Sequence, residues 1–214
     1  MADRVPLDFD PPIRQLRALL MGVTTSDLSA PTPCPGWTVG TLLDHVMGLS
    51  LAFTQAARKT TDAPGSDGPP PEPSGANLPP HWRSRTPVLL EELATAWKEP
   101  SAWTGTARAG GVTMPATELG VVAMNEIVMH SWDLAQATGQ EMAADPRILE
   151  ALNDMLSQGP AEGSPGLFGP RVDPDPEDGL LEQALALAGR DPSWQRRSRP
   201  RRKGFSSPST SAAG

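Results

Sequence analysis

Apolar residues recur every three or four positions along most of the chain, a spacing that places them on one face of an α-helix. Ile13, Leu16, Leu19 and Leu20 form one such stripe near the N-terminus. The same spacing predicts six helices, at about residues 11–28, 39–59, 86–98, 115–139, 145–156 and 177–188. Helices therefore make up the regular structure that the sequence predicts.

Several predicted helix ends carry residues that favour such positions. Thr38 precedes the second helix, where its hydroxyl oxygen is placed to accept a hydrogen bond from a free backbone N–H. Asp145 and Pro146 form a typical start for the fifth helix, and Gly139 suits the position just past the end of the fourth. These residues support the helix boundaries deduced from the apolar spacing.

The chain is expected to fold as an all-α protein. Its 214 residues, 38% of them hydrophobic, are enough for one sizeable core. No series of alternating apolar and polar residues indicates a sheet. The segment from Ser101 to Met114 lacks helical spacing and is expected to contain a short extended turn.

Two segments offer little to bury in a core. Residues 61–80 are rich in Pro, Gly and Ser and are expected to form a mobile loop or linker within the domain. Residues 195–214 contain no acidic residue and few apolar ones, and are expected to form a basic, disordered tail. The sequence thus predicts one domain at residues 10–194 and a tail at residues 195–214.

Composition narrows the cellular setting and the partners. The first residues do not resemble a signal peptide and no apolar run is long enough to span a bilayer, so a cytoplasmic protein without a membrane partner is expected. The single cysteine, Cys34, excludes an internal disulfide and a thiolate-rich zinc site. Six of the 18 basic residues lie between Arg196 and Lys203, which leaves an acidic body that is a poor surface for nucleic acid.

Glu126 and His130 lie four residues apart in the predicted helix 115–139 and therefore point to the same side of it. The spacing suits a surface ion pair and a shared metal ion equally well. Because the helix is otherwise strongly apolar, inward-facing charges there need a partner, and a divalent cation supplies one. Asp133 is either a helix-surface acid or a residue that orients a ligand histidine.

Three further residues are candidates for chemistry. His45 lies beside the apolar stripe of the second helix, where a lone histidine is more often a hydrogen-bonded core residue than a ligand. His81 ends a loop, where a solvated role is expected. Cys34 lies in a proline-rich turn, where a lone thiol is more often inert than reactive.

Three segments resemble a known family: TPCPGWTVGTLLDHVMG at residues 32–48, NEIVMHSWDLAQATGQ at residues 125–140, and GRDPSW at residues 189–194. They are similar to segments of the mycothiol-dependent maleylpyruvate isomerase and DinB-like superfamily, especially its small metal-binding branch. The resemblance covers about residues 10–194. It implies an up-and-down four-helix bundle with added short helices, and a divalent metal bound by His45, Glu126 and His130.

Three protein ligands leave an open coordination position, which is the arrangement of a catalytic zinc site. Zn²⁺ is the expected metal, and Ni²⁺, Fe²⁺ or Mn²⁺ also suit these ligands. The resemblance implies mycothiol or a similar low-molecular-weight thiol as cosubstrate and a small-molecule electrophile as its partner. The predicted function is therefore that of a metal-dependent thiol S-transferase or a related detoxifying enzyme.

Other functions stay open beside this one. Alternatively, the protein is a non-catalytic module that binds a metal or a small ligand. In such a module a protein group such as His81 fills the fourth coordination position of the metal. A third hypothesis is nucleic-acid binding through the basic tail. Maleylpyruvate isomerisation is not expected, because the isomerase proper has a further C-terminal domain, for which this chain is too short, and a substrate-binding arginine that could not be placed. Members of the family often form homodimers, but no surface pattern in the sequence indicates one.

Overall fold

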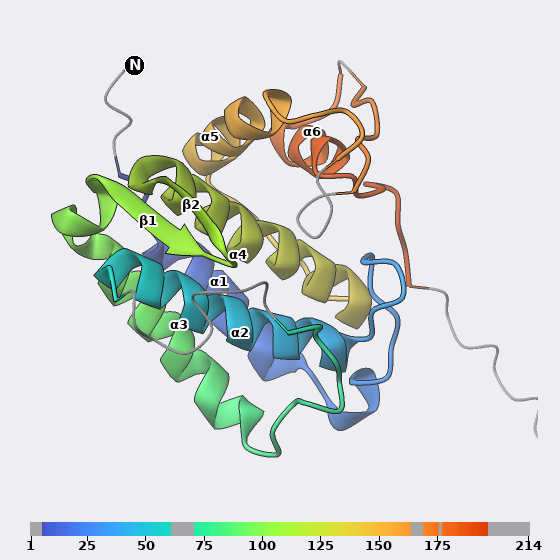
Figure 1. Cartoon of the computed structure of the whole chain (residues 1–214). Helices are drawn as coiled ribbons and strands as arrows, with labels where there is room; N and C mark the ends of the chain where they lie inside the picture. Colours follow the sequence, from blue (N-terminus) through green and yellow to red (C-terminus); the bar gives the residue numbers. More distant parts are fainter. Residues whose placement is uncertain (1–5, 61–70, 164–168, 176, 197–214) are drawn as a thin grey trace, which may run out of the picture.

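The computed structural model describes residues 6–60, 71–163, 169–175 and 177–196 (Figure 1). This part of the chain forms α1 (Asp10–Gly22), α2 (Val39–Arg58), α3 (Trp82–Lys98), α4 (Ala116–Thr138), α5 (Pro146–Ser157) and α6 (Leu180–Leu187). It also forms two 3₁₀ turns, η1 (Thr25–Asp27) and η2 (Pro100–Trp103), and two short strands, β1 (Thr106–Ala109) and β2 (Val112–Pro115). The predicted all-α fold is confirmed.

Helices α1 to α4 form a bundle in which α4 is the most deeply buried element. α1 and α2 each pack against both α3 and α4, and α5 joins α6 beside α4 (Figure 1). Of the 23 residues of α4, 18 are buried, including the polar residues Asn125, Glu126, His130, Ser131 and Asp133. Among the described residues, none of the helices combines the length and apolarity needed to cross a membrane.

The expected extended turn before α4 is a regular hairpin. β1 and β2 pair antiparallel, with Ala109 opposite Val112. The two residues between them, Gly110 and Gly111, have φ of 57° and 80°. Positive φ at both positions is typical of a two-residue type I′ turn, which glycine adopts without steric cost.

Three helix boundaries differ from those predicted. α1 ends at Gly22, because Val23 is extended and a separate 3₁₀ turn follows. α3 begins at Trp82, four residues before the predicted start at Thr86, and it accommodates Pro87. α6 begins at Leu180 and not at residue 177, because Asp175 and Asp178 hold the preceding residues in a turn through their carboxylates.

Parts of the two polar segments are fixed to the bundle. In the segment expected to be a mobile loop, the Ser74 backbone N–H donates to Asp44 Oδ2 on α2 at 3.0 Å. In the segment expected to be a disordered tail, Arg196 Nη1 donates to Asp27 Oδ1 and to the Ala137 carbonyl, both at 3.0 Å. The predictions for residues 61–70 and 197–214 fall outside the described residues.

Candidate metal centre

Three of the predicted site residues converge between α2 and α4, which lie side by side (Figure 1). His45 Nε2 on α2 lies 3.5 Å from Glu126 Oε2 on α4. His130 Nε2, one helical turn along α4, lies 3.1 Å from the same oxygen. His45, Glu126 and His130 each offer one donor atom, and these atoms lie within 4.8 Å of one another.

The two helices bury this cluster unequally. α2 begins at Thr38, whose hydroxyl oxygen accepts from the Thr41 N–H, and its buried stripe leaves His45 at the edge of the α2–α4 interface. The His45 side chain is 20% exposed. Glu126 and His130, on the central helix, are 11% and 5% exposed. The cluster is therefore most open to solvent on the side of α2.

Burial opposes charge on each of the three groups, but their contacts set different pKa values. Burial lowers the pKa of His45, although the hydrogen bond to Glu126 opposes this shift. Burial also opposes ionisation of Glu126, yet hydrogen bonds from His130 and His45 hold its pKa well below the ordinary value. For His130, hydrogen bonds to Asp133, Cys34 and Glu126 outweigh burial and raise the pKa well above its ordinary value. These shifts favour the ionised form of Glu126, the charged form of His130 and the neutral form of His45.

Asp133 contacts the second ring nitrogen of His130. His130 Nδ1 donates to Asp133 Oδ2 at 2.8 Å, which leaves Nε2 facing Glu126. The Cys34 thiol and Arg190 Nη2 donate to the same oxygen at 3.1 and 3.2 Å. Burial opposes ionisation of Asp133, but these bonds lower its pKa. Asp133 has no exposed surface, so it is not the helix-surface acid that the sequence allowed.

A second group of donors, Cys34, His130 and Asp133, also lies within 4.8 Å. It is the poorer cation site, because Asp133 already accepts from the Arg190 guanidinium, which would repel a cation bound there. The Arg190 charge also acts on His45 and Glu126, but no hydrogen bond or ion pair described joins Arg190 to either residue. Two imidazoles and one carboxylate are also ligands that zinc commonly takes in proteins. The donor chemistry therefore favours His45, Glu126 and His130.

Trp37 covers the two imidazoles. Its ring centroid lies 4.8 Å from that of His45 at an interplanar angle of 67°, and 6.1 Å from that of His130 at 23°. The turn that carries Trp37 is held by the Thr32 N–H, which donates to the Trp37 carbonyl at 3.1 Å, and by Gly36 at φ 79°. Trp37 is half-buried, and its ring contacts both imidazoles.

Arg190 and Trp37 were not predicted to be parts of this cluster, and Cys34 was expected to be inert. Trp37 and Arg190 lie outside the helices that the apolar spacing predicted. Both lie in segments that resemble the family, and this resemblance was the signal that could have identified them. His81, considered as a fourth ligand, is exposed at the start of α3 and belongs to neither donor group.

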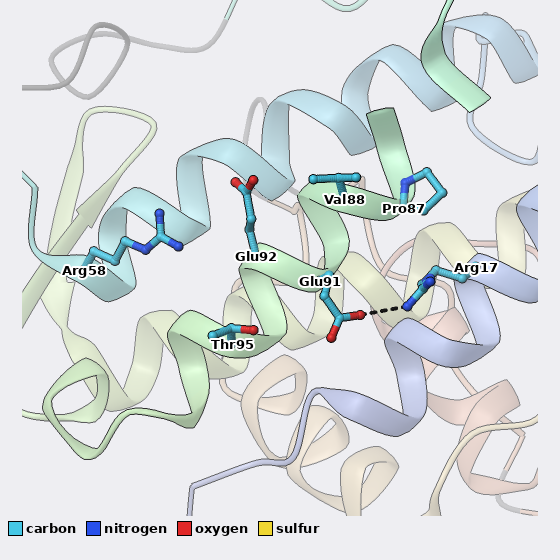
Figure 2. Close-up of a pocket in the computed structure, with 7 residues that line it drawn as sticks. All are labelled: Arg17, Arg58, Pro87, Val88, Glu91, Glu92 and Thr95. Atoms are coloured by element: carbon cyan, nitrogen blue, oxygen red, sulfur yellow. Dashed lines mark hydrogen bonds and ion pairs between the residues drawn. The ribbon is translucent and has the colours of Figure 1, made fainter. Parts of the chain in front are cut away.

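Two surface hollows lie elsewhere on the molecule. One, of about 420 Å³, is lined by residues of α1, α2 and α3, and an ion pair of 2.7 Å between Arg17 and Glu91 crosses it (Figure 2). The other, of about 240 Å³, lies among Leu7, Trp103 and Arg147. Neither hollow is lined by a residue of the donor cluster. The candidate site is therefore defined by its donor atoms and not by a surface hollow.

The family model described as the mycothiol maleylpyruvate isomerase N-terminal domain matches residues 9–135, more than half of the chain. The chain belongs to this family. Two curated relatives, the uncharacterized proteins MT0763 and Rv0738 of two Mycobacterium tuberculosis strains, are each 29% identical over 131 residues. These alignments cover 61% of this chain and 65% of the relatives' length.

Two crystal structures share the fold of this chain. One is of the mycothiol-dependent maleylpyruvate isomerase and the other is of a mutant of that enzyme. Each has a TM-score of 0.58 and 20% sequence identity, covering 86% of this chain and 87% of the isomerase chain. The DinB-like bundle is thereby confirmed. This chain was expected to be too short for the further domain of the isomerase. The alignment covers 87% of the isomerase chain and so does not support that expectation.

Proposed function

We propose that His45, Glu126 and His130 bind one divalent metal ion, and that the protein uses it in a reaction of a low-molecular-weight thiol. The observation that carries the proposal is the convergence of three donor atoms from two helices within 4.8 Å. Zn²⁺ suits this donor set best, and Ni²⁺, Fe²⁺ and Mn²⁺ are the other candidates.

The donor set supports a catalytic role for the ion. Three protein ligands leave a position for a further molecule, whereas structural zinc sites are closed by four. An ion held by two neutral imidazoles and one carboxylate keeps a net positive charge and lowers the pKa of a thiol or water in the open position. Within the chain, Asp133 would hold the His130 ring in place, and Trp37 would shield the imidazoles from water.

The thiol is proposed from the family. The isomerase with the same fold is mycothiol-dependent by name, and the chain belongs to the family of that enzyme's N-terminal domain. We propose that mycothiol or a similar thiol is the cosubstrate and that a small electrophile is the second substrate. In this conjugation the thiol loses its proton and its sulfur forms a bond to an electrophilic carbon. In return, either a leaving group departs from that carbon with the bonding electrons, or the double bond at that carbon opens and its other carbon takes up a proton.

Metal analysis of the chain purified without chelator tests the first half of the proposal. The wild-type chain should contain about one divalent ion, whereas His45→Ala and His130→Ala should contain almost none. His81→Ala is the matched control, because it removes the third histidine of the chain from an exposed position, and it should retain the ion. A wild-type chain without stoichiometric metal would falsify the metal centre.

Thiol consumption tests the second half. The metal-loaded chain is incubated with mycothiol and a panel of electrophiles that includes maleylpyruvate, and the conjugates are measured by mass spectrometry. Conjugation that His130→Ala abolishes supports the proposed enzyme. Stoichiometric metal without any conjugation would leave a non-catalytic metal-binding module, which is the alternative function.

A further inference from the structure

The segment after α6 lies along one face of the C-terminal half of α4. Arg190 Nη2 donates to Asp133 Oδ2 at 3.2 Å, and Arg196 Nη1 donates to the Ala137 carbonyl at 3.0 Å. Asp133 and Ala137 are four residues apart in α4 and therefore share a face. Two arginines of one segment thus fasten it to successive turns of the helix that carries Glu126 and His130.

Arg190 is held in place from its own side as well. Its backbone N–H donates to the Leu185 carbonyl at 2.8 Å, and Nη1 donates to the Ala188 carbonyl at 3.1 Å. The side chain is 13% exposed, and its guanidinium also lies 3.9 Å from Cys34 Sγ. A guanidinium buried in this way is paired with the fully buried Asp133 in a fixed geometry.

This pairing bears directly on the metal centre. The Asp133 oxygen that accepts from Arg190 Nη2 at 3.2 Å also contacts His130 Nδ1, at 2.8 Å. The guanidinium and the candidate ligand imidazole are thus joined through one buried carboxylate oxygen. Removing the guanidinium would remove a contact that holds the Asp133 carboxylate in line with His130 Nδ1.

We propose that Arg190 is a positioning residue of the metal centre, acting through Asp133 on the orientation of His130. The inference rests on the proposed metal site and deepens it, because it makes the C-terminal segment part of the site's construction. Since coupling between two equilibria is reciprocal, metal binding also strengthens the docking of residues 188–196 on α4.

Zinc affinity of Arg190→Met, measured by competition with a chromophoric chelator, tests the proposal. The contacts that orient ligand histidines commonly contribute 10- to 100-fold to metal affinity, so a loss of about that size is expected. Arg196→Met is the matched control: it releases an arginine of the same segment from the same face of α4 but leaves the Asp133 contact intact. Its zinc affinity should stay within about twofold of wild type.

A double-mutant cycle shows whether Arg190 acts through Asp133. The double variant Arg190→Met, Asp133→Asn should bind zinc no more weakly than Asp133→Asn alone, because the path to His130 is already removed. Zinc should also slow hydrogen exchange at residues 188–196 in the wild-type chain and less so in Arg190→Met. Neither readout responds to a merely structural role. Circular dichroism checks the helical content of each variant.

The outcomes separate the two proposals. Equal zinc affinity for Arg190→Met and Arg196→Met, or additive losses in the cycle, overturns this inference while the metal centre stands. Absence of zinc binding by the wild-type chain overturns both.

If Arg190→Met does not fold, Arg190→Lys takes its place, because lysine keeps the charge but not the planar fork. A loss of about threefold or more is then expected, and unchanged affinity would contradict the role.

Discussion

His45 Nε2 and Glu126 Oε2 lie 3.5 Å apart although their residues belong to two different helices, α2 and α4. The donor set is therefore complete only when these helices pack in their native register. An ion bound there would join two walls of the bundle. We therefore expect metal binding and folding stability to be linked in this protein, so that each can be measured through the other.

Removal of the metal should lower the thermal stability of the chain. A ligand present at 100 times its Kd stabilises the native state by about 2.7 kcal/mol. For a domain of this size, that corresponds to a fall in Tm of roughly 5–10 °C when a chelator removes the ion. Calorimetry of the wild-type chain with and without EDTA measures the shift. His45→Ala should show no chelator effect, and an equal shift in that variant would place the ion elsewhere.

Zinc binding at neutral pH should release about one proton from the site. The pKa of His45 is lowered from 6.5, so this ring is already neutral at pH 7. The pKa of His130 is raised well above 6.5, so the ion must displace a proton from Nε2. The other ring proton stays on Nδ1, where it is hydrogen-bonded to Asp133. The apparent affinity should thus rise about tenfold per pH unit above pH 6.5 and level off beyond the pKa of His130.

Calorimetric titration with zinc in buffers of different ionisation enthalpy counts these protons. A release of two protons at pH 7 would mean that His45 is charged in the free site, and a release of none would mean that His130 is neutral. His81→Ala serves as the reference, because its exposed imidazole lies outside the donor groups and should not change the count.

Local sequence signals predicted the helices that carry the site. Pro115 and Gly139 border α4 as expected, and Gly139 has the left-handed φ of 68° that favours glycine past a helix end. The predicted start of α3 at Thr86 was wrong, because the helix begins one turn earlier at the buried Trp82. Such a choice depends on tertiary burial and not on local preference.

The convergence of the three donor residues could be predicted, but their surroundings could not. Glu126 and His130 share a helix, so their spacing alone brought them together, and the family resemblance supplied His45. Arg190 contacts Asp133 although the two residues are 57 positions apart, and no periodicity in the sequence encodes that contact. Whether a cysteine such as Cys34 contacts a buried carboxylate likewise depends on the packing of distant segments.

Gly189→Ala should disturb the turn that presents Arg190. Gly189 has φ of 75°, and a Cβ atom added there would lie 2.7 Å from the Pro170 carbonyl oxygen, too close for either backbone to remain in place. A cost of about 1–3 kcal/mol in the free energy of unfolding is expected, together with weaker zinc binding. Urea unfolding and chelator competition measure the two effects.

Gly48→Ala is the matched control for that substitution. Gly48 lies within α2, and a Cβ atom there meets nothing within 4 Å. Because alanine is the better helix former, this variant should gain roughly 0.5–1 kcal/mol of stability and keep its zinc affinity. Equal stability of the two glycine variants would show that the turn at Gly189 tolerates a side chain.

Cys34→Ala should distinguish between the two donor groups that share His130. Cys34 Sγ contacts Asp133, which binds the Nδ1 side of His130, whereas Glu126 faces Nε2. If the ion lies on the Nε2 side, Cys34→Ala retains about one zinc per chain and His45→Ala loses it. Cobalt-loaded protein should then lack a thiolate-to-cobalt charge-transfer band. Loss of the ion in Cys34→Ala, with retention in His45→Ala, would place it instead among Cys34, His130 and Asp133.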